Sequence, residues 1–274
     1  MERKFQQLKA SDGVKLYWQA WEPDGNAEAT VCLLHGLGEH AGRYDHVARA
    51  FTAKGIAFHA IDLRGHGKSE GPRGHTPSLD QWLDDIRLLI DHANAEKARF
   101  LYGHSLGGLL ALRFGLRPTT PLTGVIATGP ALRRKFEVPT LKLLLGRLMS
   151  RVWPTFSQHS GLNPHDLSRD ESVVQAYIDD PLVHDWASAR LFIEATRAGE
   201  ETLAHAAEFH QPLLLICGQE DHIIDVSACE TFFEQSTSED KTLRILPGLY
   251  HEVHNEPEKA GAIEEIVTWV VQRI

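Results

Sequence analysis

Cysteine is scarce in this sequence, and no long hydrophobic run is present. The 274-residue chain contains only three cysteines, Cys32, Cys217 and Cys229, which form no close pair. This pattern gives no sign of a disulfide framework and favours a reduced, cytoplasmic setting. The opening segment 1–13 is charged and leads into no apolar signal sequence, and no later run approaches the length of a membrane span. We therefore expect neither secretion nor a transmembrane anchor.

Basic residues are also too few to suggest a nucleic-acid partner. The chain has 28 lysines and arginines against 37 acidic residues, a formal net charge of −9. Such a chain offers no basic stripe to neutralise phosphates. Its 42% hydrophobic and 24% charged residues are typical of a folded globular protein, and no feature marks an obligate protein partner.

What the sequence does contain is a series of short apolar segments that alternate with helical patterns. Residues 14–21 alternate apolar and polar side chains, which predicts a strand in an antiparallel edge hairpin. Residues 79–90 repeat apolar side chains at helical spacing behind Ser78, a candidate N-cap, and a second such pattern follows Pro257. The remaining segments are typical of parallel strands covered on both faces: 30–36, 56–63, 99–105, 123–129, 212–218 and 243–248. This order predicts an α/β fold, with a mostly parallel central sheet flanked by helices.

One long segment interrupts the alternation. Residues 133–209 contain helical patterns but no convincing strand. We predict that they form a helical cap, or lid, inserted into a core made of residues 1–132 and 210–274. The beginning of this cap, 138–153, is rich in leucine.

A serine nucleophile is indicated at the end of one predicted strand. Gly103-His104-Ser105-Leu106-Gly107 lies between the apolar strand 99–105 and a helical pattern. In that context G-x-S-x-G forms the sharp strand-to-helix turn of an α/β-hydrolase, where glycines avoid collisions around the serine. The alternative is a chance G-x-S-x-G pentapeptide in a glycine-rich turn, and the flanking strand and helical pattern argue against it. The pattern therefore predicts Ser105 as the nucleophile.

An acid must follow the serine in the chain. A serine hydroxyl needs a base to take its proton and an acid to orient that base, in the order Ser, Asp or Glu, His for this fold. Glu220, Asp221 and Asp225 all follow the predicted strand 212–218. Asp221 is favoured because Glu220 is adjacent to the strand and Asp225 is placed to cap the next helix.

The histidine that serves as base is less clearly marked. His251 and His254 both follow the predicted strand 243–248. His251 is nearer to the strand end, but spacing alone leaves both residues open.

The oxyanion of an acyl-transfer intermediate needs two backbone N–H donors. Leu106, directly after the nucleophile, is predicted to supply the first. Leu37, in the glycine-rich turn after the strand 30–36, is predicted to supply the second. His35 precedes that turn and is interpreted as a buried, hydrogen-bonded residue that shapes it.

No metal or cofactor motif is complete. His251 and His254 are one residue too close for H-E-x-x-H. Gly36 and Gly38 lack the third glycine of a dinucleotide fingerprint. We expect no cofactor and no metal.

Five segments together resemble the monoacylglycerol lipases of the α/β-hydrolase superfamily. They are HGLGEHAGRY (35–44), DLRGHGKSEGPRGH (62–75), GHSLGG (103–108), GQEDHIID (218–225) and YHEVHNE (250–256). The resemblance implies a Ser105, Asp221 and His251 triad, which selects His251 over His254, and oxyanion donors at Leu37 and Leu106.

The resemblance further implies a polar pocket for the glycerol end of the substrate. In this sequence the pocket residues are Glu39, Arg43 and His254. The alternative for Glu39 and Arg43 is a structural ion pair at a helix start.

The activity implied is hydrolysis of a monoacylglycerol to glycerol and fatty acid through an acyl-enzyme. The alternatives are a lysophospholipase or general carboxylesterase with the same triad, and a non-catalytic binding protein of this fold.

The resemblance also implies transient membrane contact through an apolar outer face of the cap. Candidate residues are Leu141, Leu144, Leu145, Leu148 and Trp153, with Lys142, Arg147 and Arg151 on the other face. The alternative is that this apolar stripe is packed within the protein.

Overall fold

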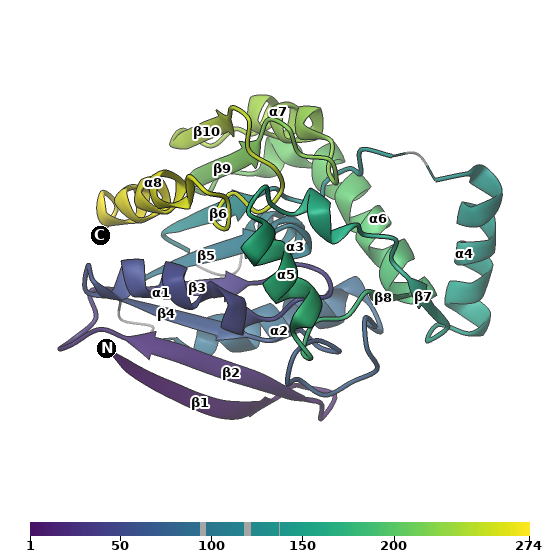
Figure 1. The fold of residues 1–274 in the computed structure, drawn as a ribbon, viewed down its shortest axis with the longest axis horizontal. Helices are drawn as coiled ribbons and strands as arrows, with labels where there is room; N and C mark the ends of the chain where they lie inside the picture. Colours follow the sequence, from purple (N-terminus) through teal and green to yellow (C-terminus); the bar gives the residue numbers. More distant parts are fainter. Residues whose placement is uncertain (94–96, 118–121, 137) are drawn as a thin grey trace.

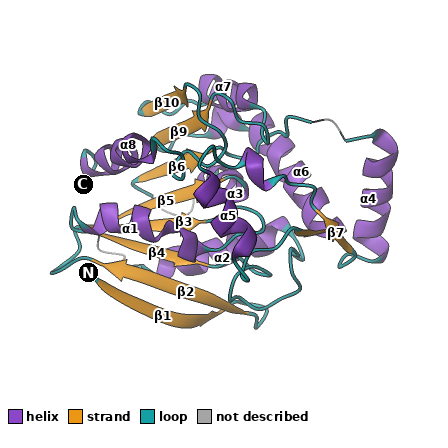
Figure 2. Ribbon diagram, viewed as in Figure 1, coloured by secondary structure: helices purple, strands orange, loops and turns teal. Residues whose placement is uncertain are grey.

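A twisted sheet of eight strands forms the centre of the molecule (Figures 1 and 2). The computed structural model describes residues 1–93, 97–117, 122–136 and 138–274. In spatial order, the strands of the sheet are β1 (Glu2–Lys9), β2 (Lys15–Glu22), β4 (Ile56–Ile61), β3 (Ala29–Leu34), β5 (Ala98–His104), β6 (Gly124–Thr128), β9 (Leu213–Gly218) and β10 (Lys241–Leu246). β1 and β2 form the predicted antiparallel hairpin, and from β4 to β10 all neighbours are parallel.

Helices cover both faces of the sheet, and neighbouring side chains of one strand enter different layers. Along β3, Val31 and Leu33 pack in one apolar cluster while Cys32 and Leu34 pack in the other. The first face is covered by α1 (Asp45–Thr52) and α8 (Lys259–Val271). The second face is covered by α2 (Leu79–His92), α3 (Leu106–Gly115) and α7 (Val226–Gln235). The predicted α/β fold is therefore confirmed, and burial on both faces explains why the central strands are continuous apolar runs.

Local capping agrees with the sequence. Ser78 Oγ accepts a hydrogen bond of 3.1 Å from the Gln81 N–H at the start of α2, as predicted. Asp225 caps α7 in the same way, accepting the Ser227 N–H at 3.0 Å.

The segment between β6 and β9 contains most of the remaining helices. It comprises α4 (Thr140–Val152), β7 (Ser157–His159), a 3₁₀ turn (Pro164–Asp166), α5 (Glu171–Asp179), β8 (Trp186–Ser188), α6 (Ala189–Ala204) and a second 3₁₀ turn (Ala206–Glu208). The expectation of no strand here is wrong in one detail, because β7 and β8 pair antiparallel over three residues. Strands this short carry too few residues for an alternating pattern. The division into core and cap stays a prediction.

The helices of this segment differ in how closely they join the sheet layers. α6 packs against α3, whereas α4 stands at the edge of the molecule and contacts α6 (Figure 1). α5 lies over the end of the sheet where the candidate site is found. No helix in the described ranges is long and apolar enough to cross a bilayer.

Candidate active site

Ser105 lies on a strained turn between β5 and α3. Its φ of 53° and ψ of −115° make it the only non-glycine residue with positive φ in the described part of the chain. Its N–H is held by the Thr128 carbonyl at 2.9 Å. A Cβ added at Gly103 would collide with the Gly107 carbonyl, and one at Gly107 would collide with the Leu34 carbonyl. Such strain persists only where the surroundings enforce it, as they do for a nucleophile raised above a sheet.

The loop after β3 lies directly beside this turn. A Cβ placed on Gly36 would lie 2.9 Å from Glu39 Oε1 and 3.3 Å from the Ser105 Cβ, so this close approach favours glycine. His35 is fully buried, with Nδ1 2.8 Å from the Gly36 carbonyl and Nε2 accepting the Leu63 N–H at 2.8 Å. The prediction that His35 shapes the turn is confirmed. Leu37 therefore lies in the loop adjacent to Ser105, and the N–H of Leu106, the first residue of α3, has no partner within that helix.

Asp221 and His251 form a buried pair at the ends of β9 and β10. His251 Nδ1 lies 2.6 Å from Asp221 Oδ2, and the two side chains are 2% and 0% exposed. The other carboxylate oxygen accepts the N–H groups of Ile223 and Ile224 at 2.8 and 3.0 Å. This arrangement protonates Nδ1 and leaves Nε2 as the basic nitrogen of the ring.

The competing residues are placed elsewhere. Glu220 is exposed, and Asp225 caps α7 and pairs with Arg133 at 3.1 Å. His254 lies on the same loop as His251 but makes no side-chain hydrogen bond among the described residues. Of these candidates, the structure brings together only Asp221 and His251.

Electrostatics favour the charged form of this pair. Burial would lower the pKa of His251, but the Asp221 carboxylate, together with the nearby carboxylates of Glu252 and Glu39, raises that pKa above its ordinary value. Burial would likewise raise the pKa of Asp221, and the facing imidazole holds it below its usual range. The ring of His104 lies 4.8 Å from that of His251, and burial lowers the pKa of His104 to about 3. His104 is therefore neutral next to the pair.

Glu39 and Arg43, from the loop and turn after β3, form an ion pair. Arg43 Nη1 donates to Glu39 Oε2 at 2.7 Å. Glu39 Oε1 accepts the Gly36 N–H at 2.6 Å and the Tyr44 hydroxyl at 2.8 Å. Arg43 also donates two hydrogen bonds to Glu252, the residue after His251. These contacts agree with the alternative that Glu39 and Arg43 form a structural ion pair. They also place both side chains next to the loops that carry Leu37 and His251.

His254 occupies the centre of an aromatic cluster. Its ring stacks on Tyr44 at 4.8 Å and meets the edge of His104 at 4.7 Å. The residue is fully buried, and neither ring nitrogen has a partner among the described residues. A buried polar atom without a hydrogen bond costs about 1–3 kcal/mol, which a polar group arriving in this region would recover.

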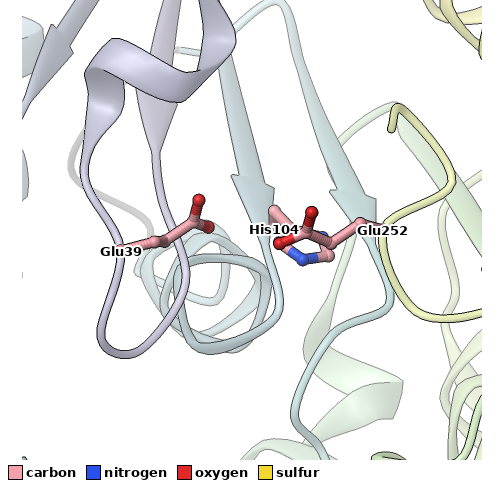
Figure 3. A group of neighbouring side chains, drawn as sticks. All are labelled: Glu39, His104 and Glu252. Atoms are coloured by element: carbon pink, nitrogen blue, oxygen red, sulfur yellow. The ribbon is translucent and has the colours of Figure 1, made fainter. Parts of the chain in front are cut away.

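Three buried side chains in this region have the spacing of metal ligands. Glu39, His104 and Glu252 each offer one ligand atom within 4.8 Å of the others (Figure 3). However, the Arg43 guanidinium already bridges the two carboxylates, so a cation would have to displace it. The donor set therefore fits an arginine-centred ion cluster better than a metal site.

The sequence interpretation missed Glu252 and Tyr177. Tyr177 of α5 places its ring 4.8 Å from the Arg43 guanidinium carbon, but no motif marked it. Glu252 was visible only as the second letter of an incomplete H-E-x-x-H. Its partner Arg43 is 209 positions away, so no local signal links them.

The fold and this site define an α/β-hydrolase. The family described as serine aminopeptidase, S33, matches residues 25–258, and the chain belongs to that family. It is therefore a hydrolase, and the predicted resemblance to monoacylglycerol lipases is confirmed by its relatives.

Three of these relatives illustrate the similarity. The chain is 34% identical to a monoacylglycerol lipase of Mycolicibacterium smegmatis over 96% of this chain and 95% of that protein. The crystal structure of a monoacylglycerol lipase from Paleococcus ferrophilus has a TM-score of 0.89 and 35% identity, covering 94% of this chain and 99% of that one. An uncharacterized abhydrolase domain-containing protein of Dictyostelium discoideum is 38% identical over 97% of this chain, which spans only 29% of that longer protein.

Proposed function

We propose that this protein hydrolyses monoacylglycerols to glycerol and a free fatty acid. The chemistry is supported by one observation above all: the ring of His251, in its buried pair with Asp221, lies 4.8 Å from the ring of His104, the residue before the strained Ser105. The substrate class is supported by the full-length similarity to proteins named monoacylglycerol lipases.

In the proposed reaction, Ser105 Oγ attacks the ester carbonyl carbon while His251 Nε2 takes the hydroxyl proton. The resulting imidazolium is stabilised by Asp221, and the oxyanion accepts hydrogen bonds from the N–H groups of Leu37 and Leu106. The ester C–O bond then breaks, and the glycerol oxygen leaves with the proton from His251. Water attacks the acyl-enzyme by the same route, releasing the fatty acid and restoring the Ser105 hydroxyl.

The glycerol end of the substrate is proposed to meet Glu39, Arg43 and His254. A diol leaving group needs hydrogen-bond partners, whereas its acyl chain needs apolar surroundings. His254 supports this role because both of its ring nitrogens are unpartnered within the described part of the chain. Glu39 and Arg43 support it less directly, because most of their hydrogen-bonding groups already bind each other, Glu252, Tyr44 and Gly36.

A membrane surface is the proposed site of encounter with the lipid. Leu141, Leu144, Leu145 and Leu148 share one face of α4 and are 54–77% exposed, and Trp153 is 57% exposed. The stripe is thus not packed against the described part of the chain. An exposed apolar helix face with flanking basic residues suits a lipid interface.

A reduced cytoplasmic location is proposed on the state of the cysteines. Cys32, Cys217 and Cys229 are all buried and unpaired.

The test is hydrolysis of a monoacylglycerol series, with di- and triacylglycerols and lysophosphatidylcholine alongside. Ser105→Ala serves as the blank. A clear preference for monoacylglycerols supports the proposal, and equal or greater turnover of lysophosphatidylcholine would replace it with a lysophospholipase. Failure to react with a fluorophosphonate probe would revive the non-catalytic alternative.

A further inference from the structure

One arginine connects the two loops that the proposed mechanism requires. Arg43 Nη1 and Nη2 donate to the two Glu252 oxygens at 2.7 and 2.8 Å, and Nη1 also donates to Glu39 at 2.7 Å. Glu39 is two residues after Leu37, and Glu252 directly follows His251. Figure 3 shows the side chains of Glu39 and Glu252 reaching from these separate loops into the same region. One guanidinium therefore links the loop that carries Leu37, the proposed oxyanion donor, to the loop that carries His251, the proposed base.

This cluster is shielded from water and held from several sides. The side chains of Arg43, Glu39 and Glu252 are 9%, 3% and 2% exposed. Glu252 Oε2 also accepts the Asn255 side-chain amide at 2.7 Å, and the Glu252 N–H donates to the Leu167 carbonyl at 2.8 Å. Two parallel charge-assisted hydrogen bonds in such surroundings restrict the orientation of both partners.

We propose that Glu252 is a positioning residue for the proposed ester hydrolysis: it fixes the His251 loop against the oxyanion loop through Arg43, and its negative charge stabilises protonated His251. This inference rests on the proposed function, because it assigns a part in the same reaction. It adds a residue that does not itself touch the reacting atoms.

The charges around His251 support the second half of the proposal. Asp221 provides the largest favourable interaction with protonated His251, and Glu252 and Glu39 add to it, so that together they outweigh burial and raise the pKa of His251. Although burial would raise the pKa of Glu252, Arg43 holds it below its ordinary range, so Glu252 stays ionised. Among the described residues, the other titratable or charged groups around Asp221, His251 and Glu252 include Arg43, His104, His254, Tyr44, Tyr102, Tyr177 and Cys229. The ammonium group of Lys135 also contacts the Asp221 carbonyl.

The decisive variants are Glu252→Gln and Glu252→Asp. Glutamine keeps the size of the side chain and removes the charge, whereas aspartate keeps the charge but is one methylene too short to reach Arg43 in the same way. Glu256→Gln is the matched control. Glu256 is a fully buried carboxylate on the same loop, but it accepts the Tyr250 N–H at 2.6 Å and pairs with Arg169 at 2.9 Å rather than with Arg43.

Steady-state hydrolysis of a monoacylglycerol and labelling of Ser105 by a fluorophosphonate probe are measured across pH for each variant. Thermal melts establish that the variants are folded. We expect Glu252→Gln to lower kcat by about 10- to 100-fold with a much smaller change in KM, because misplaced reacting groups lose rate rather than affinity. The acid limb of its pH–activity profile should move to lower pH, because the loss of the Glu252 charge makes protonated His251 less stable. Glu252→Asp should lower kcat but keep the acid limb of the parent, and Glu256→Gln should keep both.

A folded Glu252→Gln variant with the kcat and acid limb of the parent would overturn the inference. The same changes in Glu256→Gln would also overturn it, because they would show a general effect of loop stability. If Glu252→Gln does not fold, Glu252→Asp decides, and an unchanged kcat would count against positioning. Failure of the proposed function looks different, because the parent itself would then label with the probe without hydrolysing monoacylglycerols, or would not label at all.

Discussion

His251 Nδ1 lies 2.6 Å from Asp221 Oδ2, in a pair whose side chains are almost completely excluded from water. The two residues are 30 positions apart and come from the ends of neighbouring parallel strands, β9 and β10. Because the parallel strands end at one edge of the sheet, that edge also receives Ser105 from β5 and the loop that follows β3. The sheet therefore gathers all four segments of the proposed machinery at one place.

Replacing Asp221 by asparagine should lower kcat by about 10⁴-fold, because an amide no longer holds His251 in the required tautomer. The variant should remain folded, since the asparagine carbonyl can still accept from Ile223 and Ile224. Asp225→Asn is the control, because asparagine also caps helices well and Asp225 lies outside the pair. Steady-state kinetics measure both, and equal loss in the two variants would contradict the assignment.

Two substitutions at Ser105 should separate activity from strain. Ser105→Ala and Ser105→Gly should both lose about 10⁴- to 10⁶-fold in kcat. Only glycine adopts a φ of 53° freely. The free energy of unfolding of Ser105→Gly should therefore be about 1 kcal/mol higher than that of Ser105→Ala, and its unfolding temperature should be higher as well. Thermal or urea unfolding measures the difference, and equal stability would mean that the turn stores no strain.

Activity should fall on the acid side with a midpoint above about 6.5, the ordinary pKa of histidine. The base must be neutral to accept the serine proton, and Asp221 raises the pKa of His251, so protonation blocks the reaction at a higher pH than for a free imidazole. The measurement is kcat/KM against pH with a substrate that does not titrate. A midpoint well below 6.5 would show that the charge of Asp221 does not dominate.

Removing the Arg43 side chain should destabilise the protein strongly. Arg43→Ala leaves the carboxylates of Glu39 and Glu252 buried without their counter-charge, which costs about 3–5 kcal/mol. Arg43→Lys should recover part of this loss, since an ammonium keeps the charge but cannot reproduce the bidentate contact. Urea unfolding provides the free energies, and an Arg43→Ala variant within 1 kcal/mol of the parent would show that the cluster contributes little.

The apolar face of α4 should bind lipid bilayers. Replacing Leu144 and Leu148 together by serine should weaken binding to anionic vesicles without changing the hydrolysis of a short water-soluble ester. Ile178→Ser is the matched control, because Ile178 is 52% exposed but lies on α5. Vesicle sedimentation measures binding, and equal effects of the two changes would argue against a specific lipid-binding face.

Local sequence was informative wherever the physical cause is itself local. The strand-turn-helix context of Ser105 and the cap at Ser78 depend on residues within a few positions, and both appear in the structure as predicted. The two three-residue strands of the inserted segment were missed because so short a pair is stabilised by its partner strand rather than by its own pattern.

The sequence by itself determined the alternation of the central strands with helices, the α/β class and the segments that supply a nucleophile, an acid and a base. Only the tertiary structure decided which acid meets His251, that Glu252 shares Arg43 with Glu39, and that the leucines of α4 remain uncovered. Backbone periodicity follows from neighbours along the chain, whereas these contacts depend on side-chain direction and on segments up to 209 residues apart. Such pairings exist only once the sheet has brought its strand ends together.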